Sequence, residues 1–168
     1  MKNSRKKIVL FLTAAAVVAA AVWGYFYYRN RDERLLRAMI SELESMVSKR
    51  PGKSNALSLL DAATPERVFA PEIKIISDLP KIEKDFTLKD LTQILVMMKK
   101  NCSSAELSLE TGKISIRQDS AAVKANGMFS GNGSGGTFRE VRDVTLECQK
   151  LNGKWKISGI KLEAVIKR

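Results

Sequence analysis

Few side chains in this sequence could perform acid–base or nucleophilic chemistry. The chain of 168 residues contains no His, which removes the commonest general base, the commonest metal ligand and every Ser-His or Cys-His pair. All of its tyrosines lie near the N-terminus: Tyr25, Tyr27 and Tyr28. Asp78, Asp85 and Asp119 lie in segments typical of loops. We therefore expect no catalytic residue, no metal site, no cofactor and no enzyme activity.

Two other motifs could bind a ligand. The glycine-rich "GNGSGG" at 131–136 is followed neither by the Lys-Ser/Thr pair of a phosphate-binding loop nor by a helical pattern, so it favours a hairpin tip. Met97, Met98 and Met128 with Phe129 could line an adaptable pocket, because thioethers fill irregular space. Ordinary core packing is the favoured interpretation of these four residues.

Helices that could position such residues are predicted by apolar periodicity. Apolar residues recur every three or four positions over 36–47, and Pro51-Gly52 ends this helix. A shorter helix is expected over 54–63. A third is expected over 88–101, where Thr87 and Asp90 form a capping box.

Strands are predicted wherever apolar and polar residues alternate. After a short strand at 71–77 comes a charged loop, and Asn152-Gly153 is a favourable hairpin turn. Four longer alternating segments follow the third helix: 105–118, 121–133, 137–149 and 153–167. They predict an antiparallel meander.

The alternation changes face at three places, each of which predicts a bulge that bends the sheet. These places are Gly112, the segment between Val141 and Val144, and Ser158-Gly159. At Gly112 a second interpretation stays open, since "LSLETGKISI" could instead form a tight hairpin.

The two cysteines are expected to be free thiols. Cys102 precedes the first long strand and Cys148 ends the third, so the meander places them at opposite ends. About twelve residues of strand span roughly 40 Å, far more than a disulfide tolerates. Cys148 shares a face with Val144 and Leu146, which predicts a buried position.

The N-terminal region predicts a membrane anchor. Residues 8–28 carry no charge and are long enough to cross a hydrocarbon core of about 30 Å. Residue types suited to the interface stand at its two ends: Lys6 and Lys7 precede the run, and Trp23, Tyr25, Tyr27 and Tyr28 lie at its far end. A cleaved signal peptide is the alternative, with Ala19 and Ala21 as the small-residue pair, but the apolar run continues beyond them. We expect residues 1–7 to form a short cytoplasmic tail, 8–28 an uncleaved anchor in a bacterial inner membrane, and 29–168 a periplasmic domain.

The positive charge is concentrated at the N-terminus. Seven basic and two acidic residues in 1–34 supply +5 of the formal +11. The rest is spread among interleaved acidic residues without a basic stripe or a zinc motif, so nucleic-acid binding is not expected.

The order of elements resembles the nuclear transport factor 2-like (NTF2-like) family, a cystatin-like cone shared with ketosteroid isomerases and polyketide cyclases. The resemblance covers 32–168 and is carried by "RVFAPEIKIIS", "ISIRQDSAAVKANG" and "GKWKISGIKL". It implies an α+β fold in which three helices pack on a strongly curved antiparallel sheet. Enzymes of the family commonly use an Asp base with a Tyr or His partner, and this domain has neither partner.

We therefore expect a non-catalytic protein-interaction module of an envelope assembly, which forms a homodimer or binds an envelope protein. The first alternative is a small apolar ligand held in the cone interior. Six residues would line that pocket: Phe69, Phe86, Met97, Met98, Phe129 and Trp155. A cyclase- or isomerase-type enzyme is a weaker alternative.

Overall fold

The structure is a computed structural model that describes residues 2–49 and 64–165, except for the side chains of 2–16, 20 and 26–30. The chain divides into two compact units, Met1–Leu35 and Leu36–Arg168. The helix expected over 54–63 lies outside the described residues.

The first unit is helical. Helix α1 (Lys2–Val47) begins there and continues into the second unit, so the two helices expected at 8–28 and from residue 36 are one. The linking residues contain no Pro or Gly to interrupt it. Trp23 is 76% exposed and Tyr25 is 66% exposed, whereas the side chains of Lys6, Lys7, Tyr27 and Tyr28 lie outside the described residues. In the part of the chain that the structure describes, no helix is both long and apolar enough to cross a membrane.

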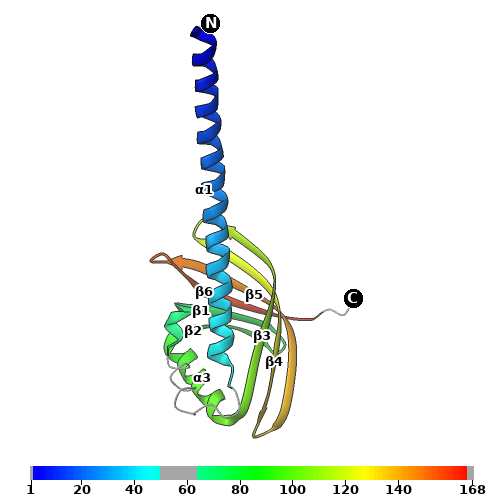
Figure 1. Cartoon of the computed structure of the whole chain (residues 1–168). Helices are drawn as coiled ribbons and strands as arrows, with labels where there is room; N and C mark the ends of the chain where they lie inside the picture. Colours follow the sequence, from blue (N-terminus) through cyan, green and yellow to red (C-terminus); the bar gives the residue numbers. More distant parts are fainter. Residues whose placement is uncertain (1, 50–63, 166–168) are drawn as a thin grey trace. The chain divides into compact units, whose positions relative to one another are not determined.

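The second unit is built on one six-stranded sheet. Its strands are β1 (Phe69–Asp78), β2 (Lys81–Thr87), β3 (Cys102–Arg117), β4 (Ser120–Gly133), β5 (Gly136–Leu151) and β6 (Lys154–Ala164). Their order across the sheet is β2-β1-β6-β5-β4-β3, as Figure 1 shows. Neighbouring strands are antiparallel except for β1 and β6, which are parallel.

Two expectations about this sheet are wrong. The sheet is mixed rather than antiparallel, because β1 and β6 each have one unpaired edge after forming their hairpins and meet along it. The charged segment before Thr87 is strand β2 rather than a loop. Its charges are compatible with a strand because β2 lies at the edge of the sheet, where charged side chains discourage pairing with other chains.

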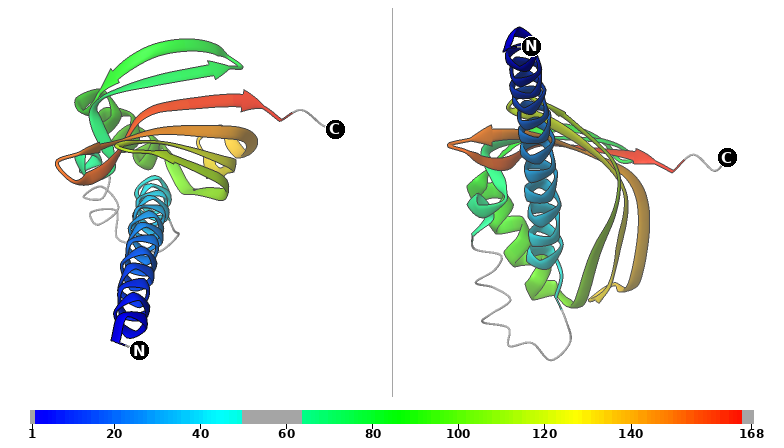
Figure 2. Two further views of the ribbon diagram at one scale, coloured as in Figure 1. Left: turned by 90° about the horizontal axis from the view of Figure 1, so that it is seen from above. Right: turned by 45° about the horizontal axis from the view of Figure 1, so that its top comes forward.

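Of the register shifts in the sheet, two lie in the long strands where the sequence predicts them. The register of β3 against β4 slips by one residue between Thr111 and Ile114, so the segment is one bulged strand and not a hairpin. Ser158 is the extra residue of β6 between the partners of Glu147 and Cys148. Figure 2 shows that β3, β4 and β5 curve together around the helices. Both bulges confirm the predictions at these positions.

The third predicted bulge is wrong. The pairing of β5 with β4 and with β6 has no slip between Val141 and Val144. Val141 is 49% exposed while Val144 is buried. Val141 is therefore an apolar residue on the outer face of the sheet. In the sequence, an apolar residue on that face looks the same as a change of register.

Helices cover the inner face of the sheet. The capping box predicted for α3 (Leu88–Asn101) is confirmed: the Asp90 N–H donates to Thr87 Oγ1 and the Thr87 N–H donates to Asp90 Oδ2. A short 3₁₀ helix, η1 (Pro65–Arg67), precedes β1. The core packs the second-unit part of α1 and α3 against the sheet through these buried residues: Leu36, Met39, Ile40, Leu43, Met46, Leu91, Leu95, Val123, Leu146, Trp155 and Ile157.

Candidate functional site: the groove between α1 and β3

The end of α1 holds the outer edge of β3. Lys49 and Ala105 exchange two backbone hydrogen bonds of 2.6 and 3.1 Å. One step along β3, the Leu107 N–H donates to Ser48 Oγ at 3.1 Å, and the Leu109 N–H donates to Glu44 Oε1 at 2.6 Å. Unpaired edge donors invite aggregation and are costly when buried. Three successive outward N–H groups of β3 are thus satisfied by α1 and the two residues that follow it.

Lys49 also links α1 to the end of α3. Its Nζ donates to the carbonyl oxygens of Lys99 and Cys102, both at 2.7 Å. These carbonyls lie at the C-terminus of α3, where a cation is favourable because the helix dipole is negative there. The Lys49 ammonium therefore fixes where α3 ends and β3 begins.

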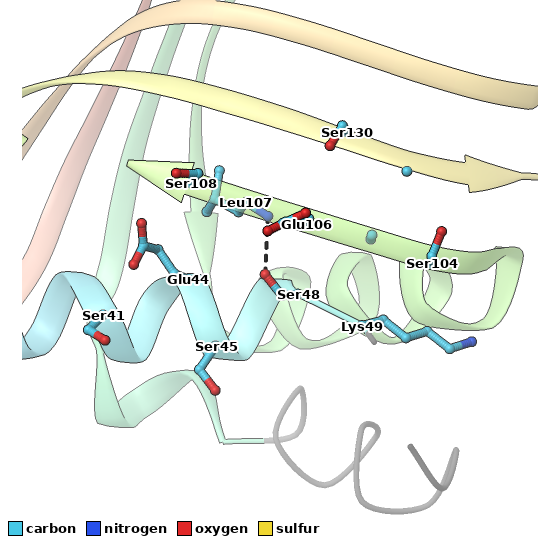
Figure 3. A pocket seen from close by; sticks show the side chains of 12 residues that line it. Ser41, Glu44, Ser45, Ser48, Lys49, Ser104, Glu106, Leu107, Ser108 and Ser130 are labelled. Carbon is cyan, nitrogen blue, oxygen red and sulfur yellow. Dashed lines mark hydrogen bonds between the residues drawn. The ribbon is translucent and has the colours of Figure 1, made fainter. Parts of the chain in front are cut away.

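A polar groove of about 830 Å³ runs along this junction. We call it the α1–β3 groove, and Figure 3 shows its lining. Its walls are Ser41, Glu44 and Ser45 from α1, Ser48 and Lys49 directly after it, Ser104–Ser108 from β3, and Ser130 and Gly131 from β4. Serine hydroxyls dominate the lining and can both donate and accept hydrogen bonds. The groove is suited to binding a polar ligand.

The chemistry available in the groove is limited. Glu44, Ser48 and Lys49 each make a hydrogen bond that holds β3 or α3, and the remaining charged residue of the lining, Glu106, is exposed on β3. Within the described residues, no group of carboxylates and thiols could hold a metal ion. The groove thus offers hydrogen-bond recognition rather than a poised acid, base or nucleophile.

The six residues predicted to line an apolar pocket lie in different surroundings among the described residues. Phe69 and Trp155 are buried in the core, and Met97 is 62% exposed on α3. Phe86 and Met98 are half-buried against the core. Phe129 packs on Phe138, with ring centroids 5.1 Å apart. The α1–β3 groove contains none of the six.

Sequence reasoning missed the groove residues. Ser41, Ser45 and Ser48 recur at four- and three-residue steps, so they share one face of a helix. Ser104, Glu106 and Ser108 are every second residue of β3 and therefore share one face of the strand. Each stripe is visible in the sequence, but only the fold shows that the two stripes meet.

Both cysteines are free thiols. Cys102 is opposite Gly133 at one end of the sheet, and Cys148 is opposite Ala121 at the other. Burial, with a smaller contribution from the Glu147 charge, raises the pKa of the Cys148 thiol to about 12. Cys148 is therefore an uncharged core residue rather than a reactive thiol.

No protein-family model matches the chain, and no curated protein matches it. Solved structures do match. The Kfla4162 protein from Kribbella flavida is 14% identical with a TM-score of 0.69, over 83% of this chain and 95% of that one. An NTF2-like superfamily protein from Salmonella enterica is 15% identical with a TM-score of 0.57, over 81% and 94%. A protein named as a candidate scytalone dehydratase, from Novosphingobium aromaticivorans, is 10% identical with a TM-score of 0.63, over 82% and 87%. Such low identities show the fold alone, and that fold is the NTF2-like α+β fold.

Proposed function

We propose that this chain is a membrane-tethered, non-catalytic binding module that holds an extended polar segment of a partner protein in the α1–β3 groove. The observation that carries the proposal is the contrast between two surfaces. The inner face of the sheet is filled with apolar side chains, while the groove of about 830 Å³ is open and lined with hydroxyls and backbone. An extended segment offers matching donors and acceptors along its length.

Several features argue against catalysis. Residues 36–168 contain no His and no Tyr. Ser77 and Lys99 are the polar residues of the second unit that are buried among its described residues, and neither lines the α1–β3 groove. The dehydratase name applies to the Novosphingobium protein, and the similarity of that protein to this chain is limited to the fold.

A small apolar ligand is less well supported than a polar one. Phe69, Trp155 and Ile157 are at most 5% exposed and pack on their neighbours. Protein interiors packed in this way leave few voids larger than a water molecule. An apolar ligand would have to displace core side chains to enter the cone.

The tether is supported by the sequence of the first unit. Residues 8–28 carry no charge and are preceded by "MKNSRKK". The proposal places this segment in a bacterial inner membrane and the second unit in the periplasm, where it would meet its partner. Binding to a partner while anchored raises the local concentration of the module at the membrane surface.

Site-specific cross-linking tests the proposal. A photoreactive amino acid replaces Ser45, which is exposed in the groove, in the full chain expressed in a bacterial membrane. The matched control replaces Gln93, an exposed residue of α3 outside the groove. We expect one defined protein adduct from position 45 that is lost when Ser108→Trp fills the groove. Equal adducts from both positions, or an adduct that survives Ser108→Trp, would contradict the proposal.

A further inference from the structure

On the outer edge of β3, the backbone N–H groups that border the groove already have acceptors. In an antiparallel strand the N–H and C=O of one residue point to the same side. The N–H groups of Leu107 and Leu109 donate to α1, so the carbonyls of these residues also point away from β4. The outward N–H groups of Leu107 and Leu109 are bonded to Ser48 and Glu44, and the Leu107 carbonyl is directed toward the same edge, where Leu107 lines the groove.

The side chains add more acceptors. Glu44 uses Oε1 to accept the Leu109 N–H, which leaves its second carboxylate oxygen, and Figure 3 shows the carboxylate lying against the strand. Glu106 is exposed and lines the groove from β3. The cation of the lining, Lys49, already donates to two carbonyls. The lining therefore carries two carboxylates against one ammonium, a net charge of −1, and the ammonium is directed at the carbonyls of Lys99 and Cys102.

We propose that the groove selects a cationic segment, a Lys- or Arg-rich extended peptide. This inference rests on the proposed binding function and names its ligand class. A peptide of this kind supplies N–H donors for the Leu107 carbonyl and the positive charge that Glu44 and Glu106 favour. Arg139 of β5 is opposite Ser130 and places a positive charge beyond the β4 wall. Because like charges repel, we expect the cationic side chains of the bound peptide to lie toward α1 and β3.

The net positive charge of the chain makes this ligand preference specific to the groove. The protein is formally +11, so a cationic peptide is repelled by most of its surface and gains attraction only where carboxylates are concentrated. An acidic peptide would instead bind weakly at many basic positions. Preference for a cationic peptide is thus a property of the groove and not of the protein's overall charge.

A peptide-binding assay tests the inference. Fluorescent decapeptides that alternate Lys, Ser or Glu with Gly are titrated into the full chain in a non-ionic detergent, and binding is read by anisotropy. We expect the Lys peptide to bind best and to weaken as NaCl is raised, because salt screens exposed charges. Glu106→Gln is expected to reduce its affinity about two- to five-fold, the range that one exposed ion pair supplies.

The matched control is Glu110→Gln. Glu110 is exposed on the same face of β3 as Glu106 but lies outside the groove, and the two variants change the net charge equally. Equal losses in both variants, or equal binding of all three peptides, would overturn the cationic preference and leave the binding role standing. Absence of binding by every peptide, together with no adduct at position 45, would overturn both.

Discussion

Cys148 shows how burial determines the chemistry of a single residue. Its thiol is buried and its pKa is raised to about 12, so the neutral form that suits the core persists far above the ordinary cysteine pKa of about 8.5. The stabilisation from burying it neutral is present below that ordinary value and is lost only as the pH rises toward 12.

Alkylation of the native protein is therefore expected to be selective. Iodoacetamide at pH 8 should modify Cys102, which is half-buried, and spare Cys148 until the chain is denatured. Peptide mass spectrometry before and after denaturation measures this. Native modification of Cys148, or a Cys102–Cys148 disulfide, would show that the described core is wrong.

Gly131 is a residue whose lack of a side chain is required by packing. A Cβ at this position would lie 2.7 Å from Phe138 Cζ and would also meet the Ser104 carbonyl oxygen. Gly131→Ala is expected to lower the free energy of unfolding by about 1–3 kcal/mol, as overpacking does. Gly135→Ala is the control, because a Cβ there meets nothing within 4 Å. Equal denaturation midpoints for the two variants would refute the close approach.

At the scale of elements, the α1 contacts protect the edge of β3. Ser48→Ala leaves the Leu107 N–H without its acceptor, and we expect a loss of about 1 kcal/mol with faster amide exchange at Leu107. Ser45→Ala removes a groove hydroxyl of α1 from which Figure 3 draws no hydrogen bond to β3, and it should change neither quantity. Unchanged exchange at Leu107 in Ser48→Ala would argue against the edge contact.

The start of α3 depends on its capping box. Thr87→Ala removes the acceptor for the Asp90 N–H and is expected to cost about 1 kcal/mol. Hydrogen bonds from the Thr87 backbone and hydroxyl lower the pKa of Asp90. This stabilisation is present above the ordinary aspartate pKa of about 3.9 and is lost as the pH falls toward the lowered value. The difference in stability between wild type and Thr87→Ala should thus narrow below about pH 4, and a constant difference would contradict this role.

Short sequence patterns predicted the features that depend on interactions between residues close together in the chain. The capping residues of α3, the Asn152-Gly153 turn and the bulges at Gly112 and Ser158 were all readable in the sequence. Strand β2 was missed because its charges also suit a loop, and only its place at the sheet edge distinguishes the two.

Non-local contacts could not be read in this way. The parallel pairing of β1 with β6 joins strands that are far apart along the chain. The groove depends on Ser48 meeting Leu107 and Glu44 meeting Leu109, which are separated by 59 and 65 residues. No pattern within one segment specifies such a meeting, although each serine stripe was present.

At the scale of the whole molecule, the proposed tether with its short basic N-terminus predicts that the second unit lies on the periplasmic side of the membrane. Ser134→Cys, in a Cys102→Ser background, places a thiol in the exposed β4–β5 turn. A membrane-impermeant maleimide should label it in intact spheroplasts, because the proposal puts the turn in the periplasm. Labelling only after lysis would place the domain on the cytoplasmic side.

Binding in the α1–β3 groove is the central claim, and an amide NMR titration tests it most directly. The full chain in non-ionic detergent micelles is titrated with the partner segment recovered at position 45. We expect shifts concentrated at Ser104–Ser108, Ser130 and the α1 serines, with the Trp155 indole N–H unmoved. Shifts confined instead to Trp155, Phe69 and Ile157 would place the ligand in the cone interior and contradict the account.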